Sequence, residues 1–309
     1  MRKDMAVIVA YLFLILLVII ASMLNPSFTT YANFRNLYNM ALPYLFMGFA
    51  QTIVILIGCI DLSVGPMVSL ATTICATLMT ETTFGFMPGL VVCIIVGLLV
   101  GLMNGLLVTK GRIQAIVVTL ATSSILSGLA LAVLPAPGGV YTKAFAKFLQ
   151  GTLPGFHAAP YVIGGILIVV IWLMMNRTRL GKNIMATGGN EDAAYNSGIN
   201  TDRVKIIAFM LCGMLSALAG VLIASRISAG DPLIGAGLTL NVIAVTVLGG
   251  TSLMGGKGGI IGTIAGIFIL LIINNILNLI GVPSFYQYVM LGVLLIAALS
   301  LSSLKIRRK

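Results

Sequence analysis

Ten apolar segments divide the chain, and each is bounded by charged residues, proline or glycine. A bilayer core about 30 Å thick needs roughly 20 residues of helix to cross it, and most of these segments reach that length. Hydrophobic residues make up 59% of the 309 residues and charged residues only 8%, a balance that excludes a soluble domain. The sequence therefore predicts an all-α polytopic membrane protein of about ten transmembrane helices, formed as one domain over residues 1–309. The segments are 5–24, 37–58, 66–79, 88–109, 113–134, 161–176, 204–224, 239–253, 259–280 and 285–304.

The distribution of basic residues predicts which loops face the cytoplasm. With a cytoplasmic amino terminus, most of the 18 lysine and arginine residues lie on the inner side, as the positive-inside rule requires. Both termini and the loop 177–205 are then cytoplasmic, and the loop 135–160 is extracytoplasmic. That outer loop contains an amphipathic stretch, Lys143–Leu149, and is either a gate, a landing surface for an outer partner or an ordinary surface loop. The net charge of +11 comes from basic residues at the ends of the apolar segments and does not indicate a nucleic-acid partner. The basic tail Lys305–Lys309 suits contact with anionic membrane lipid.

The loop 177–205 is the longest strongly polar stretch of the chain. It holds five basic residues and three of the seven acidic ones, far more chain than a simple reversal between helices needs. Asn190 is placed to cap a short helix, Glu191 and Asp192 fall in its first turn, and Gly198 follows as a stop. We interpret this loop as a docking element for a soluble partner.

Two of the apolar segments, 66–79 and 239–253, are too short to cross a bilayer. Each adjoins a glycine-rich break, Gly58–Pro66 in the first case and Gly249–Gly259 in the second. Backbone outside a helix at membrane depth is tolerated only inside protein or beside a water-filled cavity, so both breaks are expected to face a pathway or a packed interior. The two breaks align weakly with each other, but in this topology they lie on the same side and do not form an inverted repeat.

Asp61 lies in the first break, where an ionised carboxylate at the bilayer centre would cost on the order of 2.5–3.5 kcal/mol. As a structural residue, it would accept backbone N–H bonds from the turn at Leu62–Gly65. As a functional residue, it would be the ion site of a proton- or sodium-coupled secondary transporter. We favour the structural role and keep ion-coupled transport as an alternative function.

Polar residues in other segments are candidates to line a path for a polyhydroxylated solute, and each is equally suited to bond between helices. The candidates include Asn104, Asn274 and Asn275. A separate pattern, Gly97, Gly101 and Gly105, places glycine on one face of the fourth segment and predicts close packing against a neighbouring helix.

The groups that an enzyme needs are missing from the sequence. The single histidine, His157, lies in the outer loop, and no cluster of His, Cys, Asp and Glu has the spacing of a metal or acid–base site. Thr251–Gly258 lacks the first glycine of a phosphate-binding loop and has glycine where a hydroxyl residue should follow the lysine. We predict no catalytic residue, no cofactor and no metal, so that ATP and Mg, if they drive transport, are bound by a separate chain.

Three stretches together resemble the ribose/xylose/galactoside-type permeases of bacterial ABC importers, within the sugar and branched-chain amino acid permease superfamily. They are IDLSVG at Ile60–Gly65, the loop segment Leu180–Asn200 and the glycine run Leu248–Gly266. The resemblance covers nearly the whole chain. It implies a type II-like ABC importer permease in the bacterial inner membrane that carries a monosaccharide such as ribose, xylose or galactose. Another small solute, such as a nucleoside, an autoinducer-type furanose or an amino acid, is the alternative within the superfamily.

The resemblance also implies partners and site residues. Such permeases pair with a second copy or a paralogue, dock on a cytoplasmic ATPase with two fused nucleotide-binding domains, and receive solute from an extracytoplasmic solute-binding protein. The implied ATPase-coupling residues are Gly189, Asn190, Glu191, Asp192, Ala193, Ala194, Gly198 and Ile199. The implied structural motif, with a possible pathway role, is Asp61, Leu62, Ser63 and Gly65.

Overall fold

The structure is a computed structural model that describes residues 2–82, 84–283, 285–286, 289 and 292–293. Over this part of the chain every regular element is a helix, apart from one isolated antiparallel bridge between Gly138 and Gly230. The elements are α1 (Arg2–Leu24), the 3₁₀ turn η1 (Pro26–Thr29), α2 (Tyr31–Leu56), α3 (Val64–Leu78), α4 (Met87–Thr109), α5 (Ala115–Val133), α6 (Lys143–Leu149), α7 (Ala159–Arg177), α8 (Arg179–Gly189), α9 (Glu191–Asn196), α10 (Thr201–Ile227), α11 (Leu238–Leu248) and α12 (Ile260–Leu279).

Seven of the described helices are long and apolar enough to cross a membrane, namely α1, α2, α4, α5, α7, α10 and α12. The two segments that were expected to be short are short, since α3 has 15 residues and α11 has 11. The all-α membrane architecture predicted from the sequence is therefore confirmed over the described residues. The tenth predicted segment, 285–304, lies largely outside them, and so does the basic tail Lys305–Lys309.

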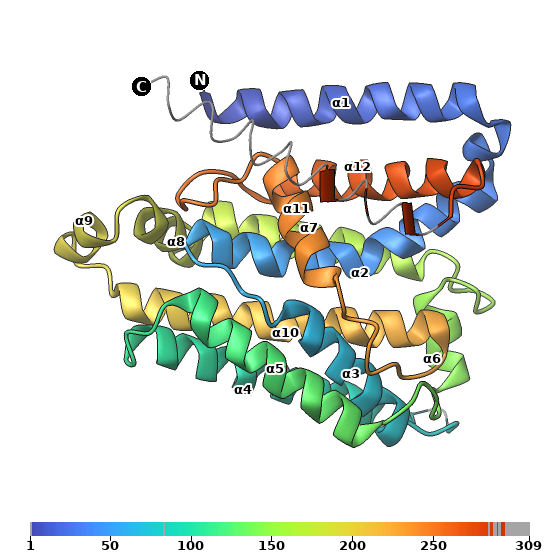
Figure 1. The fold of residues 1–309 in the computed structure, drawn as a ribbon, viewed down its shortest axis with the longest axis horizontal. Helices are drawn as coiled ribbons and strands as arrows, with labels where there is room; N and C mark the ends of the chain where they lie inside the picture. The colour runs from blue at the N-terminus through green and yellow to red at the C-terminus, as the bar shows by residue number, and fades with distance from the viewer. Residues whose placement is uncertain (1, 83, 284, 287–288, 290–291, 294–309) are drawn as a thin grey trace.

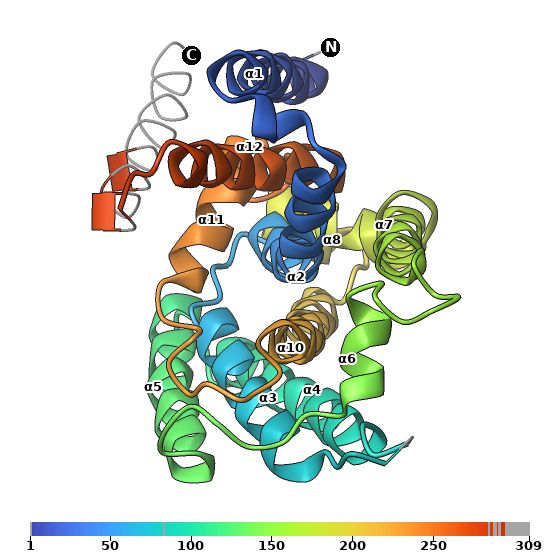
Figure 2. The same cartoon turned by 90° about the vertical axis from the view of Figure 1, so that its right-hand side faces the viewer.

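Helices α2 and α10 pack against each other at the centre of the bundle (Figure 2). In the most apolar stretch of α2, 83% of the residues are buried inside the protein, against 11% for α1, which lies along α12 at the edge (Figure 1). Lipid tails are as apolar as a protein core, so a helix needs the same hydrophobic residues in either place. Hydrophobicity alone thus does not separate the central helices from the peripheral ones.

The elements sort to two ends of the molecule along its long axis (Figure 1). The start of α1 and the α8–α9 segment lie at one end, which we call the α9 end. The connection 134–158 with α6 lies at the other, which we call the α6 end. This arrangement agrees with the prediction that the amino terminus and the loop 177–205 share one side of the membrane and the loop 135–160 lies on the opposite side.

The predicted outer loop is folded onto the α6 end of the bundle. Thr142 donates from Oγ1 to the Thr80 carbonyl at 2.6 Å, and the Tyr141 hydroxyl donates to the Val221 carbonyl at 3.1 Å. The next residue, Lys143, starts α6 and forms an exposed ion pair of 2.8 Å with Glu81, whose carboxylate raises the pKa of the lysine. The amphipathic stretch expected at Lys143–Leu149 is thus a helix held to the ends of α3 and α10.

The glycines of α4 allow α4 and α10 to pack with their backbones in close contact. A Cβ added to Gly97 would lie 2.6 Å from the carbonyl oxygen of Gly213, and one added to Gly101 would overlap the carbonyl oxygen of Phe209. Gly105 meets the backbone of Ile206 in the same way. The predicted packing role of this glycine pattern is confirmed, and α4 and α10 form a closely fitted frame beside α3.

Replacing Gly101 with alanine tests this frame. The new methyl group must push α4 away from α10, and we expect the free energy of unfolding to fall by about 1–3 kcal/mol, the usual cost of overpacking. Thermal unfolding of the purified protein in detergent measures the change. The matched control is Gly128→Ala on α5, where a Cβ meets nothing within 4 Å, so an equal loss of stability there would contradict the assignment.

Candidate functional site

The first candidate element is the break between α2 and α3, which contains Asp61. The Asp61 side chain is buried, with 2% of its surface exposed, and its Oδ1 accepts the Ser63 backbone N–H at 2.8 Å and the Ser63 hydroxyl. The Cys212 side chain of α10 lies next to the carboxylate. Because α3 begins at Val64, the carboxylate lies at a helix amino terminus, where the helix dipole and free N–H groups stabilise negative charge.

A chain of hydrogen bonds links this carboxylate to two further helices. Asn104 of α4 donates from Nδ2 to the Ser63 hydroxyl at 3.2 Å, and Thr122 of α5 donates to Asn104 Oδ1 at 2.7 Å. Asn104 and Thr122 are both buried. Among the described residues Asp61 has no ion-pair partner, so hydrogen bonds and the end of α3 compensate its burial. The structure therefore places Asp61, Ser63 and Asn104 in one buried polar cluster.

A second break, which we did not select from the sequence, has the same local geometry. Asp61–Gly65 reads DLSVG, and Asp231–Gly235, before α11, reads DPLIG. Asp231 Oδ1 accepts the Leu233 backbone N–H at 2.9 Å. Asp61 Oδ1 accepts the Ser63 backbone N–H in the same way, and in both cases the donor lies two positions after the aspartate. The shared spacing of aspartate, branched apolar residue and glycine was the signal that could have identified it.

The starts of the two short helices meet inside the bundle. Gly65 and Gly235 pack against each other with so little space that a Cβ on either one would overlap the carbonyl oxygen of the other. The Thr239 hydroxyl of α11 accepts the Gly65 N–H at 3.0 Å and donates to the Leu62 carbonyl at 3.4 Å. The motif residues Leu62, Ser63 and Gly65 thus all lie at this junction, which is closed by direct backbone contact.

From this junction the two short helices run in opposite directions (Figure 1). α3 ends beside α6, where Thr142 bonds Thr80, whereas α11 ends beside α1, where Gly250 lies against Ala6. The two glycine-rich breaks that align weakly in the sequence lie on the same side, as expected, because a Cβ on Gly255 would lie 2.8 Å from the Gly58 nitrogen. The starts of α3 and α11 are a different pair, and these two helices run in opposite directions (Figure 1).

Asn274 and Asn275 lie on α12, apart from the Asp61 cluster. Asn275 exchanges two hydrogen bonds with Asn33 at the start of α2, at 3.1 and 2.8 Å. Oδ1 of Asn274 is buried without a hydrogen-bond partner in the described part of the chain. Asn275 therefore forms an interhelical bond, and the structure does not bring either residue together with Asp61.

The candidate docking element is a helical hairpin made of α8 and α9. Asn190 Oδ1 accepts the Ala193 N–H at 2.9 Å and so caps α9, Glu191 and Asp192 occupy its first turn, and Gly198 follows it with a φ of +83°. The short helix predicted from the sequence is confirmed in its cap, acidic first turn and stop. The sequence analysis missed α8, whose cap is Thr178.

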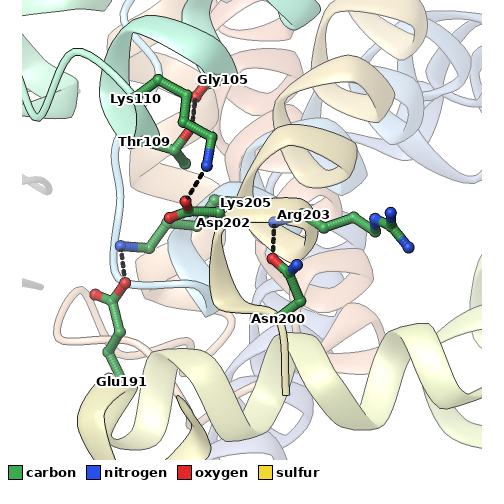
Figure 3. A network of polar contacts seen from close by, with 8 residues as sticks. All are labelled: Gly105, Thr109, Lys110, Glu191, Asn200, Asp202, Arg203 and Lys205. Carbon is green, nitrogen blue, oxygen red and sulfur yellow. Dashed lines mark hydrogen bonds and ion pairs between the residues drawn. The ribbon is translucent and has the colours of Figure 1, made fainter. Parts of the chain in front are cut away.

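Two of the three acidic residues of this region are paired within the chain. Glu191 lies 2.5 Å from Lys205, and Asp202 lies 2.7 Å from Lys110 at the end of α4 (Figure 3). Glu191 and Asp192 are both among the implied coupling residues, and of these two the structure leaves Asp192 without an ion pair in the described part of the chain. Glu191 is paired because α10 begins directly beside α9 and brings Lys205 within reach.

The exposed surface of α9 differs from the predicted one. Ala193 is exposed, whereas Ala194, expected to meet a partner, is buried with 5% exposed. Tyr195, which the sequence analysis did not select, leaves 69% of its surface exposed. Ile199 is partly buried and packs against the hydrophobic core. Tyr195 and Asp192 therefore offer a free apolar and a free charged contact at the α9 end of the molecule.

A cavity of about 640 Å³ lies between the first break, the α4–α5 turn and α9. Its lining includes Cys59 and Ile60 of the break, Arg112 of the turn, and the ion-paired Glu191 and Lys205. No group of three or more His, Cys, Asp or Glu side chains is placed to hold a metal ion in the described residues. The cavity therefore brings the first break, the α4–α5 turn and α9 to one shared space.

Over residues 33–299, the sequence matches the family described as the permease component of branched-chain amino acid transport systems. The chain belongs to this family. It is 41% identical to the ribose import permease protein RbsC of Bacillus subtilis (strain 168), over 96% of this chain and 92% of that protein. The chain is 34% identical to the L-arabinose transport system permease protein AraH of Escherichia coli (strain K12), over 100% of this chain and 92% of that protein. It is 33% identical to the D-allose transport system permease protein AlsC of the same strain, over 94% of this chain and 90% of that protein. No solved structure matches the chain.

These relatives confirm the resemblance inferred from the three sequence stretches. They are named as permeases of sugar transport systems, and they match this chain over nearly its full length. Together with the seven apolar helices, this makes the chain a multi-pass membrane permease subunit and not an enzyme. The Asp61 break, the Asp231 break and the α8–α9 hairpin are therefore elements of a permease.

Two substitutions of Asp61 separate charge from structure in this permease. Asp61→Ala removes the acceptor of the Ser63 N–H and leaves a buried donor unpaired, and we expect the free energy of unfolding to fall by about 1–3 kcal/mol. Asp61→Asn keeps an acceptor oxygen and should retain most of the stability, and solute preference should be unchanged. Thermal unfolding and uptake of competing sugars measure both effects. A changed solute preference with normal stability would place Asp61 in the transport path.

Proposed function

We propose that this permease is the membrane subunit of an ATP-driven importer of a monosaccharide, with ribose as the first substrate to test. The observation that carries the proposal is the match to ribose, allose and arabinose permeases over nine-tenths or more of both chains. These three solutes are all small polyhydroxylated sugars. A nucleoside, a furanose of the autoinducer type or an amino acid would then be rejected or carried poorly.

ATP and Mg bind in this proposal to a separate ATPase with two fused nucleotide-binding domains. The glycine-rich loop between α11 and α12 supports this division of work, because its backbone is used for packing inside the chain. A Cβ on Gly255 would lie 2.6 Å from the Gly188 carbonyl oxygen, and the Gly256 N–H donates to the Leu56 carbonyl at 3.0 Å. A loop occupied in this way does not cradle a phosphate.

The ATPase docks on α8–α9 at the α9 end of the molecule, which faces the cytoplasm together with both termini. Exposed Tyr195 and Asp192 support this assignment, since an exposed aromatic side chain is a common anchor in protein interfaces. A solute-binding protein approaches the α6 end from outside the bacterial inner membrane. A second copy of the chain or a paralogue completes the path, and anionic lipids surround the basic cytoplasmic end. ATP-driven movement of the docked hairpin then opens the path alternately to the two sides.

Ion-coupled transport through Asp61 is the second candidate function, and its support is the burial of a carboxylate inside the bundle. The hydrogen bonds from Ser63 and the position at the start of α3 count against it. These contacts already stabilise the carboxylate without a transported ion.

Reconstitution in liposomes decides between the two functions. Vesicles that contain the permease and its ATPase, supplied with the solute-binding protein outside and ATP inside, should accumulate labelled ribose. ADP in place of ATP, or omission of either partner, should abolish uptake. Accumulation by the permease alone under a proton or sodium gradient, and its loss in Asp61→Asn, would overturn the ATP-driven assignment.

The docking assignment has its own test in Tyr195→Ala. Loss of an exposed aromatic anchor should weaken binding of the ATPase by about tenfold, while the thermal stability of the permease is unchanged because Tyr195 makes little contact with its own chain. Binding of the detergent-purified proteins gives the dissociation constant. Phe156→Ala is the matched control, since it removes an aromatic ring of similar exposure, 53%, from the α6 end. Equal affinity of Tyr195→Ala and the original protein would contradict docking on α9.

A further inference from the structure

Three glycine segments that are far apart in the sequence meet at one point of the α9 end. Gly188, in the last turn of α8, packs on the end of α2 so closely that a Cβ would overlap the Leu56 carbonyl oxygen and lie 2.9 Å from the Gly256 nitrogen. A Cβ on Gly255 would lie 2.8 Å from the nitrogen of Gly58, the first residue of the break. We call this contact of Gly58, Gly188, Gly255 and Gly256 the glycine junction. It joins the docking hairpin to the Asp61 break through backbone alone.

An ion pair joins the hairpin to the bundle at a second point. Glu191 begins α9, and Lys205 lies one turn into α10 (Figure 3). The Lys205 side chain has only 15% of its surface exposed, against 47% for Glu191, so the lysine is held inside the bundle and the glutamate reaches to it. α9 is thereby attached to α10 on one side, while α8 is attached to α2 on the other.

The cavity of about 640 Å³ lies next to these contacts, with the break on one of its sides. Cys59 and Ile60 line one wall of the 640 Å³ space, and Glu191 and Lys205 line another. Closely packed protein transmits displacement with little compression, whereas a void of this size absorbs it. Movement of the hairpin is therefore delivered at the glycine junction and the ion pair, and the break has space to shift beside them.

We propose that Gly188 and Lys205 are positioning residues that transmit the movement of α8–α9 to the Asp61 break, and so to the junction of α3 with α11. The proposal rests on the proposed function and specifies its route within this chain. Glycine at position 188 lets the hairpin act on the α2 end through direct backbone contact. Lys205 holds α9 at a constant distance from α10 while the hairpin moves. Neither residue contacts the solute in this mechanism.

The first test compares Gly188→Ala with Gly165→Ala in the reconstituted complex of permease, ATPase and solute-binding protein. We expect Gly188→Ala to keep ATP hydrolysis and to lower the number of sugar molecules carried per ATP by about fivefold, a loss typical of residues that couple two sites. Gly165→Ala on α7 should leave this ratio unchanged, because a Cβ there meets nothing within 4 Å. An unchanged ratio in an assembled Gly188→Ala complex would overturn the proposal.

The second test uses Lys205 and stays decisive if Gly188→Ala does not assemble. Lys205→Met keeps the length of the side chain and removes the pair with Glu191, and the sugar-to-ATP ratio should fall by about threefold, within the range of a single ion pair. Lys205→Arg keeps the pair and should restore the original ratio with unchanged ATPase binding. Equal ratios in Lys205→Met and Lys205→Arg would overturn the role of the ion pair.

Failure of this proposal and failure of the proposed function give different results. If the original complex carries no sugar with ATP, the proposed function is wrong, and the variants are not needed to show it. If the original complex carries sugar and the Gly188 and Lys205 variants carry it with the same sugar-to-ATP ratio, the function holds and the transmission route is wrong.

Discussion

The structure depends on one requirement: backbone that leaves a helix inside the bundle must have its polar groups satisfied by protein. At the first break Asp61 accepts the buried Ser63 N–H, and at the second the Ser69 hydroxyl accepts the buried Gly235 N–H. The Thr239 hydroxyl accepts the Gly65 N–H and donates to the Leu62 carbonyl across the junction, and Gly65 packs directly on Gly235. These bonds allow α3 and α11 to begin inside the bundle. As a result, α3 and α11 start next to each other and run in opposite directions. The proposed transport path depends on this arrangement.

Glycine has two separate mechanical roles in this permease. On α4, Gly97 and Gly101 bring two long helices together and make a frame that should not change shape, because every added atom meets the backbone of α10. At the α9 end, glycines from three segments place the hairpin directly on the end of α2 and the first break. The closely packed α4–α10 frame, the contact of the hairpin with α2 and the cavity of about 640 Å³ are the features on which the proposed transmission route depends.

Much of this could be predicted from residues that act locally. The cap at Asn190, the acidic first turn and Gly198 define α9 within a few residues of chain, and the glycine spacing on α4 indicates a packing face regardless of the partner. Features made by distant residues could not be predicted. Lys205 pairs with Glu191 only because α10 starts beside α9, and Asn275 pairs with Asn33 across more than two hundred residues. Asp231 was missed although its motif repeats that of Asp61. So short a motif is not distinctive in the sequence, and its importance shows only where the starts of the two helices meet in the structure.

The sequence by itself determined the membrane class, the helical content, the two short segments and the position of α9. Each of these follows from local composition, spacing or capping, which do not depend on where distant parts of the chain lie. The family followed from the resemblance of three stretches to known permeases. Only the tertiary structure decided which helices are central, since lipid and protein core select the same apolar residues. It also decided that the short helices oppose each other and that Ala194 and Glu191 face their own chain. The reason is that burial and ion pairing are contacts between segments, and their partners are set by packing.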